Sequence, residues 1–333
     1  MAPQLNCAAP PLSSRKGYYN QRFLMNHSPI ISIVLCTYNN ADSLRITLNQ
    51  LISQREADGK IEIIVVNNNA SDHTADVCNA IAPSSKFPFH YMFEARQGLS
   101  HARNTGVENA TGQYVLFTDD DAELPNDWAA QYLKTIESKK ADCLYSSIAV
   151  IWDQPRPWWY LDAYKACFVE LNYGLDILEI TDIHHEFFGK NFCVKKDLII
   201  QQGGFDPALG RNGSKLIAGE ETLLYRSLIH NNARVIYFPS APVGHRLKPK
   251  EYTPEHITKL FIDGAYSSLH IAKVSKNKKI GGRPLGLLLA STKTLINAVI
   301  AYFFSFASAK NIRFYHNLRI KKSLTTITLW VKN

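Results

Sequence analysis

Short apolar runs rich in β-branched residues recur along the first third of the chain and alternate with segments of helical periodicity. Three such runs occupy residues 30–37, 61–66 and 113–118. Apolar strands that alternate with helices indicate a parallel sheet with helices on both faces, so we expect an α/β fold. The carboxyl ends of parallel strands lie at one edge of the sheet, where ligands of such folds bind. A functional site is therefore expected beyond the ends of these runs.

Each of the three runs ends in a polar cluster, at residues 37–40, 67–72 and 119–121. The last cluster is three adjacent aspartates, whose carboxylates repel one another and are costly to bury without a partner. One interpretation is a solvated turn ahead of a helix. The other is a site for Mg²⁺ or Mn²⁺, because hard divalent cations take oxygen ligands and relieve the repulsion. The convergence of three clusters favours the second interpretation.

Glycine-rich phosphate loops do not occur in the sequence. No GxGxxG motif follows the first run and there is no GxxxxGK[ST] motif, so neither a dinucleotide fold nor a P-loop is predicted. A diphosphate ligand would then be held through a cation bound to carboxylates. The six cysteines form no CxxC pair or Cys/His cluster, so neither a structural zinc site nor a disulfide framework is expected.

Several ordered motifs lie between residues 30 and 245: ISIVLCTYNN, IEIIVVNNNASDHT, EARQGLSHARNTGVENATGQYVLFTDDD, GKNFCVKKDLIIQQGGFD, GEETLLYRSLIHNNARVIYFP and a following histidine. In these motifs the chain resembles a family 2 glycosyltransferase with the GT-A fold. The resemblance implies a Rossmann-like, mostly parallel sheet. It also implies inverting, metal-dependent transfer of a sugar from a nucleotide diphosphate, preferably a UDP-sugar, to a glycan or lipid-linked acceptor in cell-surface polysaccharide biosynthesis.

The resemblance also implies a role for each matched position. The residues implied to bind the nucleotide-sugar donor are Thr37, Asn39, Asn67, Arg96, Arg103, Asp119 and Asp120. A divalent cation, Mn²⁺ or Mg²⁺, is implied at Asp121 and His245. Asn67 stands where many members have an aspartate, which leaves the base of the nucleotide open. Arg96 and Arg103 also fit surface arginines, and His245 fits a packing histidine.

Two adjacent acids, Glu220 and Glu221, open a predicted helix. Acids in the first turn of a helix are favoured by the helix dipole, so capping alone explains either of them. The family commonly has Glu-Asp here, with the second residue as general base, which implies Glu221 as the base and Glu220 as the reserve. Because Glu221 is one methylene longer than the usual aspartate, a catalytically inactive nucleotide-binding scaffold remains the alternative. A second alternative, which is an enzyme, is a nucleotidyltransferase.

Charge is distributed unevenly along the chain. Residues 1–245 hold 21 Lys and Arg against 26 Asp and Glu, whereas residues 246–333 hold 16 against 3. Residues 285–309 form a long apolar segment between basic stretches, which fits a helix pair on an anionic membrane surface or a soluble helical cap. No nucleic-acid module accompanies the charge, so no nucleic-acid partner is expected. The expected location is the cytoplasm, peripheral or monotopic at the inner face of the plasma membrane.

The expected organisation has three parts: a disordered lead at 1–28, a GT-A glycosyltransferase domain at 29–246 and a basic helical region at 247–333. Within the domain, the aromatic segment WDQPRPWWY at residues 152–160 fits an acceptor-stacking surface, a membrane interface or core packing. Lys190 and Asn191 lie in a matched motif and are expected to contact donor or acceptor.

Overall fold

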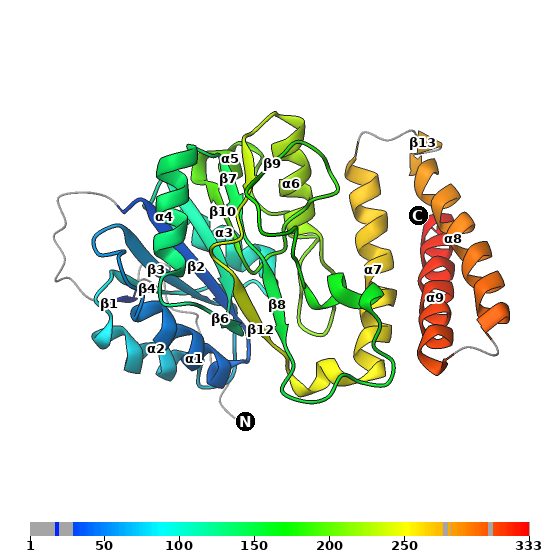
Figure 1. Ribbon diagram of the computed structural model, residues 1–333, viewed down its shortest axis with the longest axis horizontal. Coiled ribbons are helices and arrows are strands. Elements are labelled where there is room, and N and C mark those ends of the chain that lie inside the picture. The colour runs from blue at the N-terminus through cyan, green and yellow to red at the C-terminus, as the bar shows by residue number, and fades with distance from the viewer. Residues whose placement is uncertain (1–16, 20–28, 276–278, 281, 306–308, 333) are drawn as a thin grey trace, which may run out of the picture.

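The computed structural model describes residues 17–19, 29–275, 279–280, 282–305 and 309–332. Its larger part is a sheet flanked by helices, and long carboxyl-terminal helices stand beside it (Figure 1). The predicted disordered lead lies outside the described residues, except for strand β1 (Gly17–Tyr19), which pairs with the edge of the sheet.

The large sheet has nine strands within the described ranges, in the order β1-β4-β3-β2-β5-β10-β7-β11-β9. The pairs from β4 to β5 are parallel and so are β7 and β11, whereas β1, β9 and β10 run antiparallel to their neighbours. The prediction of a mostly parallel sheet is therefore confirmed. The strands after β1 are β2 (Ile31–Thr37), β3 (Ile61–Asn67), β4 (Phe89–Phe93), β5 (Tyr114–Asp119), β7 (Cys143–Tyr145), β9 (Leu178–Ile180), β10 (Phe192–Lys195) and β11 (Val235–Tyr237).

Helices pack closely on this sheet. Strands β2 and β3 are buried along their whole length, as expected when helices cover both faces. Gly106 permits one close approach, because a Cβ there would lie 2.4 Å from Cγ1 of Val34 on β2. The helices around the sheet are α1 (Ala41–Ile52), α2 (Thr74–Ile81), η2 (Ala82–Ser84), α3 (Leu99–Asn109), α4 (Trp128–Lys139), η3 (Asp162–Phe168), α5 (Lys196–Gln201) and α6 (Glu220–His230).

A small second sheet follows the aspartate cluster and has the strand order β6-β12-β8. Strand β6 (Ala122–Glu123) begins directly after Asp121, and β8 is Ile148–Ile151. Strand β12 (Val243–Arg246) places His245 opposite Ala122, and the Arg246 amide donates to the carbonyl of Asp121 at 3.0 Å. This sheet brings His245 beside the aspartates, although more than 120 residues separate them in sequence.

The carboxyl-terminal region begins with η4 (Pro249–Tyr252) and α7 (Pro254–Val274), followed by the short β13 (Lys279–Ile280) and β14 (Arg283–Pro284). Helices α8 (Leu285–Phe304) and α9 (Lys310–Lys332) complete it. Helix α9 packs against both α7 and α8 and lies between them, so α8 is outermost (Figure 1). Within the described ranges, α8 alone is long and apolar enough to cross a membrane by length and composition.

A second apolar core joins this region to the sheet domain. It contains Trp159, Tyr160, Tyr164, Phe168, Leu247, Ile257 and Leu318. Trp159 is fully buried, so core packing explains the middle of the 152–160 segment. Trp158 is half-exposed, and the ammonium group of Lys310 lies 4.3 Å from its ring centroid. The aromatic segment thus connects the sheet domain to α9.

Candidate active site

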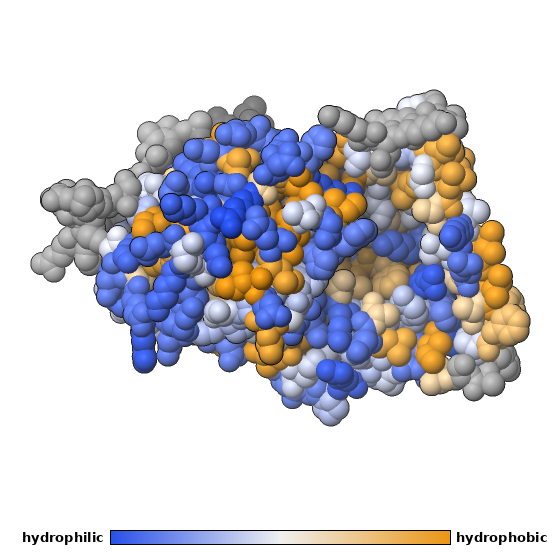
Figure 2. Space-filling model, turned by 45° about the horizontal axis from the view of Figure 1, so that its top comes forward, coloured by the Kyte–Doolittle hydropathy of each residue, from blue (hydrophilic) through white to orange (hydrophobic). Residues whose placement is uncertain are grey.

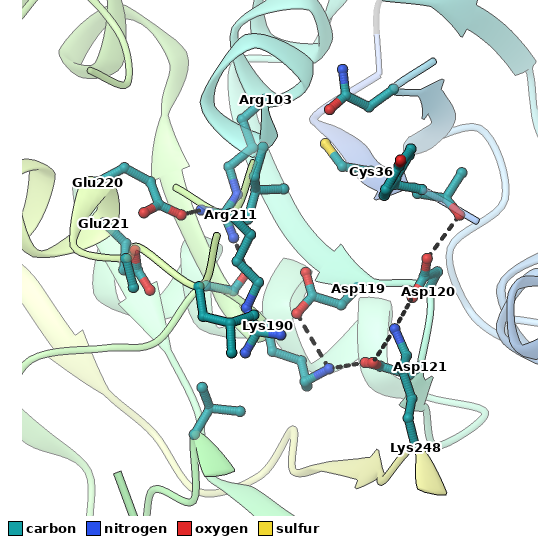
Figure 3. Close-up of a pocket in the computed structure, with 18 of the residues that line it drawn as sticks. Cys36, Arg103, Asp119, Asp120, Asp121, Lys190, Arg211, Glu220, Glu221 and Lys248 are labelled. Atoms are coloured by element: carbon teal, nitrogen blue, oxygen red, sulfur yellow. Dashed lines mark hydrogen bonds and ion pairs between the residues drawn. The ribbon is translucent and has the colours of Figure 1, made fainter. Parts of the chain in front are cut away.

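A cavity of about 220 Å³ opens at the carboxyl ends of β2 and β5, where the sequence places its site. The predicted site residues that line it are Thr37, Arg103, Asp119, Asp120, Asp121, Glu220, Glu221 and His245 (Figure 3). Lys190, expected from the sequence as a ligand contact, lines it as well. The aspartate cluster and the glutamate pair therefore share one cavity.

The three aspartates alternate with two lysines around the cavity wall (Figure 3). The Lys190 ammonium lies 3.2 Å from Oδ2 of Asp119 and also contacts Oδ1 of Asp121. The Lys248 ammonium lies 3.4 Å from Oδ2 of Asp121 and 3.8 Å from Oδ1 of Asp120. These contacts offset the electrostatic repulsion among the three adjacent aspartates.

Asp120 is held by side chains at the end of β2 and at the start of α1. Thr37 donates to Oδ2 of Asp120 at 2.7 Å, and Asn40 donates to Oδ1 at 2.6 Å. Burial raises the pKa of Asp120 to about 6, and these donors and Lys248 oppose that rise. Both oxygens of Asp120 are thus engaged within the protein, so this residue positions the loop.

Positive charge keeps Asp121 ionised. Burial acts to raise its pKa, but Lys190, His245 and Lys248 outweigh burial and hold the pKa well below its usual range. The carboxylate is therefore charged near neutral pH, with Lys190 at one oxygen and Lys248 at the other.

His245 has a defined tautomer because of its backbone partner. Its Nδ1 lies 2.9 Å from the carbonyl of Phe168, and a carbonyl only accepts, so we infer that Nδ1 carries the proton. Burial and the nearby Lys190 lower the pKa of His245, which keeps the ring neutral. The unprotonated Nε2 then faces Oδ2 of Asp121 at 3.9 Å. Metal-binding histidines have this arrangement.

The donor set for a divalent cation is small. The described part of the chain holds no group of three or more His, Cys, Asp or Glu side chains arranged to bind a metal. Asp121 and His245 nevertheless provide one oxygen and one nitrogen that face each other. These two donors would hold one side of a divalent cation, and phosphate oxygens and water would have to supply the rest.

Arg103 and Glu220 form a buried ion pair at the opposite side of the cavity, each side chain about 3% exposed. Nη1 of Arg103 donates to Oε1 of Glu220 at 2.5 Å, and Nη2 donates to the carbonyl of Gly189 at 3.2 Å. A Cβ at Gly189 would lie 2.1 Å from Nη2, so a side chain at this position would displace the guanidinium. Burial and the negative charge of Glu221 raise the pKa of Glu220 to about 8, and Arg103 opposes that rise.

Glu221 follows on the same helix, α6, but its side chain has a different environment. It is partly exposed and lines the cavity. Its Oε2 atom is buried and has no hydrogen-bond partner within the described ranges. A buried carboxylate oxygen without a donor is costly, and a ligand hydroxyl entering the cavity would supply one. Oε2 of Glu220 is likewise buried without a partner within the described ranges, but Oε1 of Glu220 accepts from Arg103. The two glutamates therefore differ in the engagement of Oε1 of Glu220 by Arg103 and in the greater exposure of Glu221.

Three residues predicted to contact the donor lie outside the cavity wall. The side-chain oxygen of Asn39 accepts from the amide of Ser71 at 2.8 Å and joins two strand-end loops. Both ends of the Asn67 side-chain amide are hydrogen-bonded to neighbouring groups. The Arg96 guanidinium is exposed and pairs with Glu94. In this structure these residues organise the loops around the site.

The remaining residues of the cavity wall are not predicted from the sequence motifs. They are Cys36, Tyr38, Asn68, Gln97, Leu99, Val169, Gly189, Arg211, Gly213, Leu216, Ala218, Lys248, Lys250 and Glu251. The basic run RLKPK after His245 is a local signal that could have identified Lys248 and Lys250. Arg211 lies in a loop with no comparable signal, so its place depends on the fold.

Comparison with protein families matches residues 32–202, more than half of the chain, to Glycosyl transferase family 2. A curated relative, the glucosyl-dolichyl phosphate glucuronosyltransferase of Haloferax volcanii, is 26% identical over 224 residues, covering 65% of this chain and 69% of that protein. Glycosyltransferase AglE of the same organism is 27% identical over 120 residues, covering 36% of this chain and 40% of that protein. The second match therefore spans less than half of the relative.

Solved structures share the fold at low sequence identity. The mannosyltransferase PcManGT from Pyrobaculum calidifontis, in complex with GDP-Man and Mn²⁺, has 19% identity and a TM-score of 0.61, covering 92% of this chain and 89% of that chain. S. aureus TarS 1-349 in complex with UDP-GlcNAc has 13% identity and a TM-score of 0.52, covering 91% of both chains. The family match and the fold agree with the curated relatives. The chain therefore belongs to glycosyl transferase family 2, and it is a glycosyltransferase with the GT-A fold.

Proposed function

We propose that the protein is an inverting glycosyltransferase that moves a sugar from a nucleoside diphosphate to a hydroxyl of a glycan or lipid-linked acceptor. One observation carries the proposal: a single cavity combines the Asp121–His245 donor pair with the unpartnered oxygen of Glu221. The first would hold a diphosphate through a cation, and the second would accept the proton of an acceptor hydroxyl. Assembly of a cell-surface polysaccharide is the process that such a transfer would serve.

Glu221 is the proposed general base. An acceptor hydroxyl is a weak nucleophile near neutral pH, and a carboxylate at hydrogen-bond distance takes its proton as it attacks the anomeric carbon. Such a base typically contributes about 10²–10⁴-fold to the rate. With the base and the leaving group on opposite faces of the sugar, the attack is in line and the configuration inverts.

Arg103 and Glu220 are proposed to support the base. Their ion pair is buried. Arg103 also donates a hydrogen bond to the Gly189 carbonyl, and it thereby connects α6 with the segment that carries Lys190. Glu220 thereby fixes the first turn of α6 and the direction in which Glu221 points. Its role is positioning, because Arg103 already engages one of its oxygens.

Asp121 and His245 are proposed to bind Mn²⁺ or Mg²⁺. When bound, the cation would neutralise charge on the departing diphosphate. Asp119 lines the same wall and faces the donor, and Thr37 holds Asp120 so that the aspartate loop keeps its shape. PcManGT was solved with Mn²⁺ on the same fold, which supports the cation assignment.

The donor proposed first is a UDP-sugar. Structures of the same fold contain UDP-GlcNAc in one case and GDP-Man in another, so both nucleotides belong in the test. The acceptor proposed is a saccharide or a lipid-linked sugar. The relative named glucosyl-dolichyl phosphate glucuronosyltransferase supports the lipid-linked class.

Membrane association is proposed from the carboxyl-terminal helices. Figure 2 shows hydrophobic residues along the right-hand edge of the molecule, over the outermost helix α8. The exposed apolar side chains of α8 are Leu289, Ile296, Ile300, Phe303 and Phe304. The basic flanking sequence complements anionic headgroups, so we place this face on the inner surface of the plasma membrane, peripheral or monotopic.

The test is to incubate the protein and Mn²⁺ with UDP- and GDP-sugars, with and without saccharide acceptors, and to analyse the released products. A glycosyltransferase releases the nucleoside diphosphate. A catalytically inactive scaffold would bind nucleotide without releasing it from the sugar. A nucleotidyltransferase would release pyrophosphate, and either of these two results contradicts the proposal.

A further inference from the structure

We propose that Lys190, with Lys248 beside it, serves as a resident cation in the donor site. The two ammonium groups neutralise the aspartates when no divalent ion is bound, and they contact the diphosphate of the donor directly. This inference rests on the proposed function, since its ligand is the diphosphate of a nucleotide sugar. The donor would thus be bound by two lysine side chains of the protein as well as by a metal ion.

The first support is the arrangement of charges. Lys190 contacts both Asp119 and Asp121, and Lys248 lies near both Asp121 and Asp120, so cations and anions alternate around the wall (Figure 3). The two lysines occupy both oxygens of Asp121. A divalent ion binding to Asp121 therefore meets positive charge that is already in place.

The second support is burial. Lys190 is only 2% exposed, and lysine is almost never fully buried unless it is paired. A lysine there costs free energy that a small apolar residue would not, so the position is maintained by its carboxylate partners and its place in the cavity wall. An ammonium group has three donors. One of them is directed to Asp121, and the ammonium also lies 3.2 Å from Oδ2 of Asp119, so donor capacity remains for a phosphate oxygen.

The third support is that the Lys190 backbone is rigidly held by its neighbour Asn191. The Asn191 side-chain oxygen accepts from Trp128 and Tyr132, each at 2.9 Å. Its amide nitrogen donates to the carbonyls of Ser147 and Ala241 at 3.0 and 2.9 Å. A side chain on such a fixed support is preorganised, and preorganised charge binds ligands with less loss of entropy.

The test measures binding of UDP and GDP by isothermal titration calorimetry, in excess Mn²⁺ and in EDTA. We expect wild-type protein to lose less than about tenfold in affinity when Mn²⁺ is removed, because the lysines remain. Lys190→Met should lose affinity for the nucleoside diphosphate relative to wild-type protein, and this loss should be at least about tenfold greater in EDTA than in Mn²⁺. Tenfold is the usual effect of removing one charge-assisted hydrogen bond. Lys195→Met is the matched control, because Lys195 forms a Lys–Asp pair with Asp142 outside the cavity wall.

A second readout uses Mn²⁺ alone, titrated against protein without nucleotide and followed by the electron paramagnetic resonance of free Mn²⁺. Removing the competing ammonium of Lys190 should tighten Mn²⁺ binding by about tenfold in Lys190→Met and leave Lys195→Met unchanged. Lys190→Arg keeps the charge and should retain binding of nucleoside diphosphate in EDTA. A purely structural lysine would affect folding and leave both of these affinities as they were.

The inference is overturned if wild-type protein loses nucleoside diphosphate binding entirely in EDTA, a result that does not depend on any variant folding. It is also overturned if Lys190→Met folds and shows wild-type affinities in both experiments. If wild-type protein binds neither UDP nor GDP even with Mn²⁺, the proposed function fails instead. In that case unchanged Mn²⁺ affinity in Lys190→Met would refute the cation role separately.

Discussion

Glu220 and Glu221 are adjacent acids of the same type, yet the fold gives them different environments. Glu220 is buried with one oxygen bound by Arg103, whereas Glu221 is partly exposed in the cavity wall. The helix pattern alone could not separate them, because both fit the first turn of a helix, and only the family resemblance ranked Glu221 first. The distinction comes from Arg103, which reaches Glu220 from a helix more than a hundred residues earlier in the chain.

Glu220 makes a prediction about the pH dependence of stability. Its pKa is raised by burial from the ordinary value of 4.5 to about 8, so the folded state binds this proton more tightly than the unfolded chain. Below that pKa Arg103 donates its hydrogen bond to the neutral acid, and the contact becomes an ion pair above it. The contribution is fully present below about pH 4.5 and is lost as the pH rises through 8. Between these values the free energy of unfolding should fall with a slope of up to about 1.4 kcal/mol per pH unit from this group.

The measurement is urea unfolding of wild-type protein and of Glu220→Gln between pH 5 and pH 9. Glutamine does not titrate, so the variant should show a flatter dependence. Parallel curves for the two proteins would mean that Glu220 does not hold its proton in the folded state.

Asn67 and Asn68 are adjacent residues for which sequence motifs do not predict which side chain lines the cavity. Asn67 was the predicted donor contact, but Asn68 lines the cavity. The two residues are neighbours at the end of a strand, and only the hydrogen bonds of each side chain separate a loop anchor from a wall residue. Apart from the Ala70 amide, those partners lie on other segments and are not encoded locally.

At the scale of elements, the strands and helices before the aspartates follow the sequence closely. The predicted run at residues 30–37 corresponds to β2 and the run at 61–66 to β3, because fully apolar strands and their polar ends are local signals. The antiparallel insertion of β10 and the small sheet β6-β12-β8 were not predicted. They depend on pairing between distant segments, and that pairing brings His245 and Lys190 to the aspartates.

The segment before β10 gives an element-scale prediction. A side chain at Gly189 would displace the Arg103 guanidinium, since a Cβ would lie 2.1 Å from Nη2. Gly189→Ala should therefore lower the free energy of unfolding by about 1–3 kcal/mol, the usual cost of overpacking a filled site. Urea unfolding checks this, with Gly286→Ala as the control, because Gly286 is an exposed glycine of ordinary φ with open space around it. A larger loss in Gly286→Ala than in Gly189→Ala would refute the packing argument.

At the scale of the whole molecule, the sheet domain and the carboxyl-terminal helices are joined through aromatic packing. The second core links residues 159–168 to α7 and α9, and Phe168 in turn holds the ring of His245. The site and the apolar helix α8 are thus parts of one connected structure. This arrangement suits an enzyme whose acceptor is carried on a membrane.

Membrane binding is predicted to need both the apolar face of α8 and anionic lipid. Replacing Phe303 and Phe304 together by serine should weaken binding to phosphatidylglycerol vesicles by at least about tenfold, because both side chains are exposed and apolar. Vesicle flotation measures this, with Leu175→Ser as the control, an equally exposed apolar change in a loop of the sheet domain. Equal flotation of wild-type and double-variant protein would contradict the membrane assignment.

The proposed mechanism depends most on Glu221 acting as the base in a donor-binding cavity. The direct measurement is the turnover number of Glu221→Gln together with its affinity for the donor, on the donor and acceptor identified by product analysis. The account predicts turnover lower by about 10²–10⁴-fold with donor affinity within a few-fold of wild type. A Glu221→Gln enzyme that turns over at the wild-type rate would contradict it.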